Sequence, residues 1–190
     1  MRVADAPDLG PVLVLPGLYD SGPDHWQTRW SAVRPGFRRV EQADWVTPRC
    51  ADWIARLDEA VERTGPEALL VAHSAACALA AHWTALHPRT IRGALLVAPS
   101  DVDAPTFPLG ATGFAPMPLQ RLPFPTIVVA SANDPYVSLD RARTFAERWG
   151  SRFVSIGDNG HINSASGLGD WPEGLRILEA LAAEARRTHA

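Results

Sequence analysis

The stretch Leu69–Cys77, with the sequence LLVAHSAAC, decides which fold we expect. A run of apolar residues ends at a serine that stands among small residues, and an Ala-rich segment without internal Gly or Pro follows at once. The apolar run suits a buried strand, and the Ala-rich segment has high helix propensity. The sequence therefore predicts a strand that turns sharply at Ser74 and continues into a helix.

Ser74 is the candidate nucleophile of this turn. A strand, a serine and a helix in direct succession form a nucleophile elbow, usually with the pattern G-x-S-x-G, because strand and helix pack closely around the turn. Here Ala72 and Ala76 stand at the two glycine positions. The small-residue requirement is nearly met although the motif itself fails. On this segment alone, a serine that only caps the helix beginning at Ala75 remains an alternative.

The rest of the chain alternates short apolar runs with amphipathic segments. Such repetition indicates βαβ units, and continuous Val, Leu and Ile runs are typical of parallel strands covered on both faces. We expect an α/β protein, a three-layer α/β/α sandwich with about six parallel strands. The strands are expected at residues 12–15, 37–41, 68–72, 93–98, 126–130 and 152–156, and the helices at 25–33, 48–61, 74–87, 138–149 and 172–186.

The 190 residues suit a single domain spanning 1–190. The segment from about 99 to 125 holds seven prolines, which exclude a regular helix. We interpret this segment as an irregular excursion over the sheet that supplies a lid or a pocket wall.

The amino-acid composition limits the kinds of partner that the chain can bind. The formal net charge of −3 gives no bulk attraction to nucleic acid or to an anionic membrane, and no apolar run is long enough for a membrane span. Cys50 and Cys77 make neither a disulfide framework nor a zinc site, and residues 1–10 lack the apolar core of a secretory signal. We expect a cytoplasmic protein that needs no metal and no cofactor; the oligomeric state stays open.

Two further residues complete a candidate catalytic set. Asp134 follows the fifth expected strand in the turn Asn133-Asp134-Pro135, although this is also good turn chemistry in its own right. His161 follows the sixth strand in a loop bracketed by glycines, a setting that suits a general base. Ser, Asp and His in this order, each past the carboxyl end of a different strand, follow the α/β-hydrolase order.

An oxyanion site and a substrate pocket are expected nearby. The backbone N–H groups of Leu18 and Ala75 are the candidate oxyanion donors, with Gly17 allowing a close backbone approach; an ordinary Pro-Gly turn is the alternative for this loop. The candidate substrate-binding residues are Gly17, His73, Trp45, Phe107 and Phe114. Met117 and Leu119 are further candidates for an apolar acyl pocket. His25 is a weaker candidate, for which helix capping or surface exposure is the preferred interpretation, and Trp26, Trp30, Trp53 and Trp149 are assigned to the core.

Taken together, these motifs resemble the small serine hydrolases related to YdeN and to retinoblastoma-binding protein nine. The resemblance covers Val12 to Leu181 and rests on six segments: Val14–Gly17 with Trp26, Gln27 and Trp30; Val71–Ser74; Ala98-Pro99; Asn133–Tyr136; Gly160–Asn163; and the distinctive tail Ser166–Gly174. It implies a compact α/β-hydrolase fold that lacks the first strands of larger relatives. It also implies that Ser74, Asp134 and His161 match the catalytic positions of the family. The departure is Ala76, where such proteins usually have glycine.

The expected function is hydrolysis of a small ester or a related acyl compound through an acyl-enzyme intermediate. A thioesterase or an amidase on the same triad is an alternative, and so is a binding protein that retains the fold without catalysis. A phosphate- or nucleotide-binding protein is disfavoured, because the chain has neither a G-x-G-x-x-G nor a G-x-x-x-x-G-K-[ST] motif.

Overall fold

The computed structural model describes residues 8–188. Most of the segment considered for a secretory signal, residues 1–7, lies outside the described residues. At the centre is one six-stranded sheet in the order β2-β1-β3-β4-β5-β6, and all neighbouring strands run parallel. The strands are β1 (Val12–Leu15), β2 (Phe37–Arg39), β3 (Leu69–His73), β4 (Gly93–Val97), β5 (Thr126–Ala130) and β6 (Arg152–Ser155).

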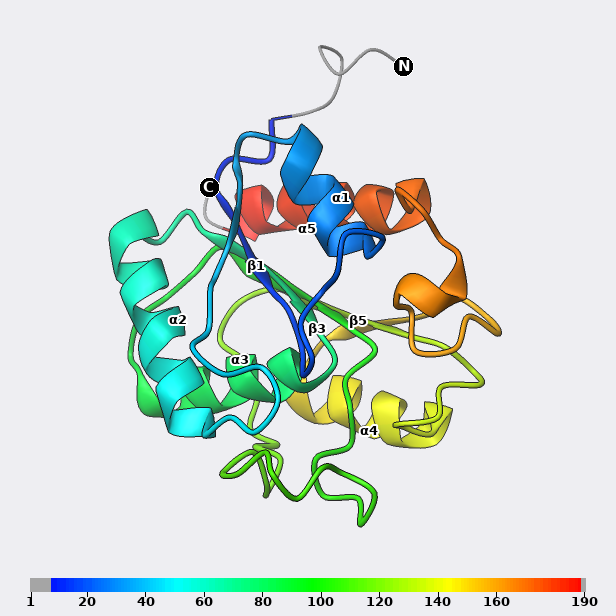
Figure 1. Ribbon diagram of the computed structural model, residues 1–190. Coiled ribbons are helices and arrows are strands. Elements are labelled where there is room, and N and C mark those ends of the chain that lie inside the picture. Colours follow the sequence, from blue (N-terminus) through cyan, green and yellow to red (C-terminus); the bar gives the residue numbers. More distant parts are fainter. Residues whose placement is uncertain (1–7, 189–190) are drawn as a thin grey trace.

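Helices cover both faces of this sheet (Figure 1). On one face lie α1 (Trp26–Val33) and α5 (Pro172–Thr188). On the other lie α2 (Cys50–Thr64), α3 (Ala75–Leu86) and α4 (Leu139–Trp149), while a short 3₁₀ helix, η2 (Ser164–Ser166), precedes α5. The expected three-layer α/β/α sandwich with six parallel strands is thus confirmed.

The strands alternate their side chains between two cores, because successive residues of a strand point to opposite faces. Leu13 and Leu15 of β1 pack in the core beneath α2, α3 and α4. Val12 and Val14 of the same strand pack in the core beneath α1 and α5. Both faces of the four central strands β1, β3, β4 and β5 are therefore covered, which is why these strands are largely continuous apolar runs, whereas the edge strands β2 and β6 carry arginines.

The proline-rich excursion between β4 and β5 contains neither a helix nor a strand, as expected, but it does not lie over the sheet. It packs against the helices of the lower layer in Figure 1. Phe114 contacts Trp53 of α2 edge to face, with ring centroids 5.4 Å apart. Trp149 of α4 donates its ring N–H to the Pro118 carbonyl over 2.7 Å. The later part of the excursion, at Phe114 and Pro118, is therefore held against α2 and α4. Its first part is left to form one wall of a pocket.

Tryptophans also fix the upper layer. Trp26 and Trp30 of α1 contact Trp171, with ring centroids 4.9 and 5.9 Å from the Trp171 ring. Trp30 donates its ring N–H to the Asp170 carbonyl over 2.7 Å. The tail segment before α5 is therefore anchored to α1, which explains why that segment is so distinctive in the sequence.

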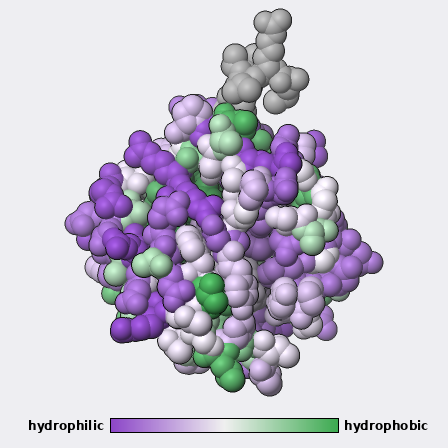
Figure 2. Space-filling model, viewed as in Figure 1, coloured by the Kyte–Doolittle hydropathy of each residue, from purple (hydrophilic) through white to green (hydrophobic). Residues whose placement is uncertain are grey.

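The outer surface is mostly hydrophilic on the face that Figure 2 shows, with hydrophobic residues scattered singly. Within residues 8–188, no helix combines the length and the apolar character that a membrane span needs. Cys50 and Cys77 are both buried and both free.

Candidate active site

Ser74 stands at the sharp turn between β3 and α3, in the backbone conformation φ 60°, ψ −127°. Non-glycine residues rarely adopt this conformation, and it is typical of strained functional turns. The Ser74 N–H donates to the Val97 carbonyl of β4, and the Ser74 carbonyl accepts from the Cys77 N–H, both over 3.0 Å. The Ser74 side chain makes no capping bond to α3. The interpretation of Ser74 as a mere helix cap is therefore wrong.

Close packing around the turn explains the small residues there. Ala72 and Ala76 have no exposed surface. Gly17, in the loop after β1, approaches the turn so closely that a Cβ atom there would lie 2.7 Å from the Ser74 Cβ and 2.9 Å from the His73 carbonyl oxygen. Such separations are too short for ordinary contact. Glycine at position 17 is therefore a steric requirement of the turn.

The structure brings His161 and Asp134 to Ser74. His161 Nε2 lies 2.8 Å from Ser74 Oγ, and His161 Nδ1 lies 2.9 and 3.0 Å from the two carboxylate oxygens of Asp134. A carboxylate accepts hydrogen bonds, so we assign the ring N–H to Nδ1, which leaves Nε2 to accept a hydrogen bond from the Ser74 hydroxyl. The Asp134 side chain has no exposed surface, and that of His161 has 8%. In this geometry, His161 can take the proton of Ser74, and Asp134 can stabilise the resulting imidazolium.

The loops that carry Asp134 and His161 are tied to each other. Asn133 Oδ1 accepts from the Gly160 N–H over 2.7 Å and from the Ser131 hydroxyl over 2.9 Å. Ser131 Oγ in turn accepts from the Asn159 N–H over 2.9 Å. The two turns after β5 and β6 therefore form one hydrogen-bonded unit, which fixes the separation of Asp134 from the base.

Two ring N–H groups hold the base loop from behind. His73 Nε2 lies 2.9 Å from the His161 carbonyl oxygen, so His73 donates and its tautomer is fixed. Trp26 Nε1 donates over 2.7 Å to the next carbonyl, that of Ile162. Ile162 has a positive φ of 49°. These two donors hold Ile162 in a backbone conformation that a β-branched residue rarely adopts, and thereby fix the loop at His161.

His25 completes a row of three imidazoles behind the site. Its Nδ1 accepts from the Gln27 N–H over 3.2 Å and caps α1, as preferred from the sequence, but its side chain is buried rather than exposed. The His73 ring lies between those of His25 and His161, with centroids 4.7 and 4.9 Å away. Burial first, and the nearby His161 charge second, lower the pKa of His25 to about 4 and that of His73 well below its ordinary value. Both rings are therefore neutral at neutral pH.

The two candidate oxyanion donors lie in the turn at Ser74 and in the loop that packs against it. The Leu18 N–H and the Ala75 N–H have no hydrogen-bond acceptor within the described part of the chain. Ala75 is the first residue of α3, where the N–H groups of a helix lack internal partners. Leu18 belongs to the loop after β1, which the Tyr19 N–H ties to the Trp45 carbonyl over 2.7 Å. An anion beside Ser74 would find both donors unoccupied.

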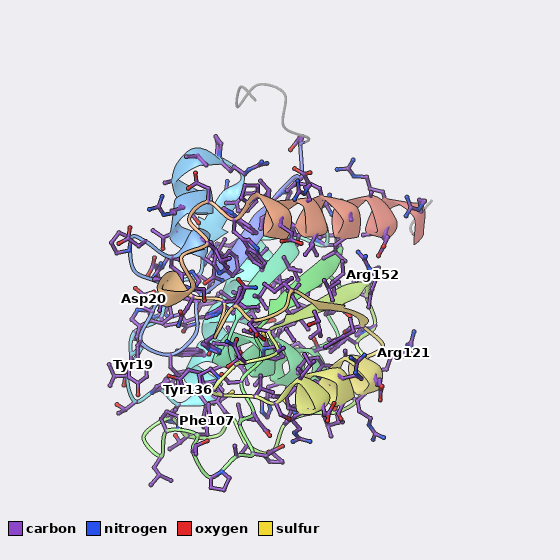
Figure 3. All side chains as sticks on the ribbon, turned by 90° about the vertical axis from the view of Figure 1, so that its right-hand side faces the viewer. Tyr19, Asp20, Phe107, Arg121, Tyr136 and Arg152 are labelled. Carbon is purple, nitrogen blue, oxygen red and sulfur yellow. The ribbon has the colours of Figure 1, made fainter. Side chains whose placement is uncertain are left out.

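A cavity of about 360 Å³ opens beside the nucleophile. It is lined by Leu18, Tyr19, Asp20, His25, His73, Ser74, Ser100, Asp101, Thr106, Phe107, Pro108, Tyr136, His161, Asn163, Ser164 and Ala165. Figure 3 shows the labelled Tyr19, Phe107 and Tyr136 at the same end of the molecule. They stand on loops that follow β1, β4 and β5, at the carboxyl edge of the sheet, where ligands of open α/β sheets bind.

The sequence-predicted pocket residues divide into two groups. His73 and Phe107 line the cavity, and Gly17 lies directly against Ser74. Trp45 and Phe114 do not line it. Trp45 packs on Trp53, with ring centroids 5.5 Å apart, and supports the first loop through its carbonyl. Phe114 is fully buried in the core beneath α2, α3 and α4, because the excursion turns inward there. Met117 and Leu119 also lie outside the cavity lining.

Two acidic residues of the cavity wall are paired with arginines. Asp20 forms an ion pair with Arg39, and Asp101 accepts from Arg141 Nε and Nη2 over 3.0 and 3.2 Å. These pairs neutralise the wall on both sides of the cavity. The side chains facing a bound molecule are therefore mainly aromatic rings, hydroxyl groups and neutral imidazoles.

The sequence analysis missed Ser100 and Tyr136 as site residues. Ser100 Oγ lies 2.9 Å from Ser74 Oγ, and the Tyr136 ring contacts the His161 ring edge to face with centroids 4.6 Å apart. Both residues stand just past the carboxyl end of a strand, the rule that selected Asp134 and His161. Applying that rule to β4, which ends at Val97, would have pointed to Ser100.

Known proteins resemble this chain in both fold and sequence. A protein described as a YdeN-like hydrolase from Pectobacterium atrosepticum is 29% identical, with a TM-score of 0.81 over 92% of this chain and 91% of that one. The ydeN gene product of B. subtilis is 19% identical, with a TM-score of 0.72 over 92% and 99%. A monoacylglycerol lipase from Paleococcus ferrophilus, 12% identical, shares the fold with a TM-score of 0.68 over 94% and 96%. No curated protein matches the chain significantly in sequence.

The family model described as serine hydrolase matches residues 12–180, which include all six strands and the turn at Ser74. The neighbouring structures carry the same α/β-hydrolase fold. The chain is similar to YdeN-like hydrolases and belongs to the serine hydrolase family.

Proposed function

We propose that this chain hydrolyses small carboxylic esters with Ser74 as nucleophile, His161 as general base and acid, and Asp134 as the group that orients the base. The observation that carries the proposal is the continuous hydrogen-bonded line from Ser74 Oγ through the His161 ring to Asp134, with separations of 2.8 and 2.9 Å. This arrangement supports the proposal because it places an acceptor nitrogen at the Ser74 hydroxyl and a carboxylate at the other ring nitrogen.

In the proposed mechanism, His161 Nε2 takes the hydroxyl proton as Ser74 Oγ bonds to the ester carbonyl carbon. The Leu18 and Ala75 N–H groups receive the oxyanion, and Asp134 stabilises the imidazolium. The intermediate collapses as the alcohol leaves with the proton from His161, so that Ser74 carries the acyl group. Water then repeats the two steps, and the acid product leaves with Ser74 restored.

The relatives support an ester substrate, and the wall of the cavity suits an uncharged acyl compound. The wall next to Ser74 combines aromatic rings with hydroxyl groups and has no unpaired charge among the described lining residues. Among the structural neighbours are a monoacylglycerol lipase and a thermophilic esterase, which supports an ester substrate by analogy of fold. Thioesters and amides remain candidates on the same residues. A purely binding role would not require the aligned Ser74, His161 and Asp134.

A fluorophosphonate probe tests the proposal directly, because it reacts with an activated serine. We expect the wild-type protein to be labelled once per chain and Ser74→Ala not to be labelled. Ser31→Ala, which removes a partly buried hydroxyl in α1, is the matched control and should react like the wild type. Equal labelling of the wild type and Ser74→Ala, or labelling of neither, would contradict the proposal. A series of p-nitrophenyl esters of increasing acyl length then measures what the cavity accepts; activity on amides or thioesters alone would move the assignment to those substrates.

A further inference from the structure

Ser100 is a buried hydroxyl in direct contact with the candidate nucleophile. It follows β4 in the segment Ala98-Pro99-Ser100, is 6% exposed and lines the cavity. Its Oγ lies 2.9 Å from Ser74 Oγ. Within residues 8–188, Ser74 Oγ is the only hydrogen-bond partner of the Ser100 hydroxyl.

The direction of this hydrogen bond follows from the rest of the site. The proton on His161 Nδ1 faces Asp134, so His161 Nε2 has to accept the single hydroxyl proton of Ser74. Ser74 then has no proton left for Ser100. The Ser100 hydroxyl is therefore the donor and Ser74 Oγ the acceptor.

The Ser100 hydroxyl is not needed to hold its own segment in place, because that segment is anchored on both sides by other hydrogen bonds. The Ala98 N–H donates to the Val129 carbonyl over 2.8 Å, and the Asp101 N–H donates to the Tyr136 carbonyl over 3.1 Å. The Asp101 side chain is bound to Arg141 as well. These anchors would hold residues 98–101 in place if Ser100 lacked its Oγ.

We propose that Ser100 is a further catalytic residue, which donates to Ser74 Oγ during acylation and accepts a hydrogen bond from the hydrolytic water during deacylation. This inference rests on the proposed function. During acylation, a donor on Ser74 Oγ stabilises the negative charge that develops as His161 removes the proton. A serine hydroxyl has two acceptor lone pairs as well as its proton, so the same group can serve the second half of the reaction.

The second role follows once Ser74 Oγ is esterified. Ester oxygens are weaker acceptors than alkoxide-like oxygens, so the Ser100 hydroxyl can turn towards the water that occupies the space beside His161 Nε2. That water gives one proton to His161 Nε2 as its oxygen bonds to the acyl carbon, and its other hydrogen bonds to Ser100 Oγ. The C–Oγ bond then breaks, His161 returns the proton to Ser74 Oγ, and the carboxylic acid leaves.

The test separates the hydroxyl from the shape of the side chain. Thr and Val have nearly the same shape and differ in the hydroxyl, so Ser100→Thr and Ser100→Val form a matched pair, with Ser100→Ala as a smaller variant. For each folded variant, stopped-flow kinetics with p-nitrophenyl acetate gives the acylation rate and the deacylation rate separately. Labelling by the fluorophosphonate probe measures the attack of Ser74 alone.

We expect acylation and deacylation each to fall about tenfold in Ser100→Val and Ser100→Ala, the effect of one lost hydrogen bond, and Ser100→Thr to stay within about threefold of the wild type in both steps. Equal rates of either step in the Thr and Val variants would overturn the inference, and so would a defect confined to KM. Those results would leave the proposed function intact if the wild type is labelled and turns over. A wild type that is neither labelled nor active would refute the proposed function, and the role of Ser100 with it.

Discussion

Gly17→Ala is the sharpest test of the contact between the first loop and the nucleophile turn. The new methyl carbon would lie 2.7 Å from the Ser74 Cβ and 2.9 Å from the His73 carbonyl oxygen. Carbon atoms pack best at about 3.5–4.0 Å, so the loop has to retreat by roughly 0.8 Å, the difference between 3.5 and 2.7 Å. Both obstacles belong to the backbone of the turn or lie next to it, so they cannot rotate out of the way.

The expected loss of activity follows from what the loop carries. A retreat of this size withdraws the Leu18 N–H from the oxyanion, and the loss of one such donor lowers kcat about 10²–10³-fold. A misplacement of about 1 Å costs activity to a similar extent. We therefore expect kcat/KM for p-nitrophenyl esters to fall about 10²-fold, with a loss in the free energy of unfolding of about 1–3 kcal/mol from overpacking.

The control is a glycine of the same loop where an added Cβ atom would meet open space. A Cβ at Gly22 would meet no atom within 4 Å, so Gly22→Ala should keep both its activity and its stability. The comparison needs steady-state kinetics and urea unfolding of both variants and the wild type. If Gly17→Ala is folded and its kcat/KM stays within threefold of the wild type, the steric argument and the assignment of Leu18 as an oxyanion donor are both refuted.

Two further predictions concern the histidines behind the site. His73→Leu removes the donor to the His161 carbonyl and should lower kcat about tenfold or more, with little change in KM. His73→Gln keeps an N–H near the position of Nε2, so it should recover much of the lost kcat. Equal activities of the two variants would show that this hydrogen bond does not position His161. The pKa of His25 is about 4 in the folded protein, against 6.5 in the unfolded chain. As the pH falls, the unfolded state therefore binds the proton first. The free energy of unfolding should decrease between pH 6.5 and pH 4 by up to about 3 kcal/mol. His25→Asn keeps a capping side chain but not the titration, so its urea midpoint should depend less on pH in this window; an unchanged pH dependence would exclude His25 as a source.

The fold was accessible from the sequence because its determinants are local. Each of the four central strands is a short, mainly apolar run, and residues such as Val14 and Leu15 can be recognised as strand-forming whichever core they enter. The helix ends were also marked locally: Ser138 caps α4 and Gly150 ends it in a left-handed conformation. The path of the excursion was not accessible, because Phe114 lies in the lower core through contacts with a helix some sixty residues earlier in the chain.

Within the candidate site, the same distinction separates what could be predicted. Ser74, Asp134 and His161 follow strand ends, and parallel strands bring their carboxyl ends to one edge, so the topology alone predicts that they are neighbours. The direction of a loop side chain depends on partners far away in the sequence. Trp45 turns towards Trp53 and away from the cavity, and the role of His73 as a donor emerges only when the loop at His161 is placed beside it.

The backbone of Ser74 has a thermodynamic consequence for the whole chain. A non-glycine residue at φ 60° and ψ −127° costs on the order of 1–3 kcal/mol. Domains are stable by only about 5–15 kcal/mol, so one residue uses up an appreciable part of that margin. Selection for a more stable protein would favour glycine at this position, and selection for reactivity favours serine. The nucleophile turn is thus a point where thermostability and activity oppose each other.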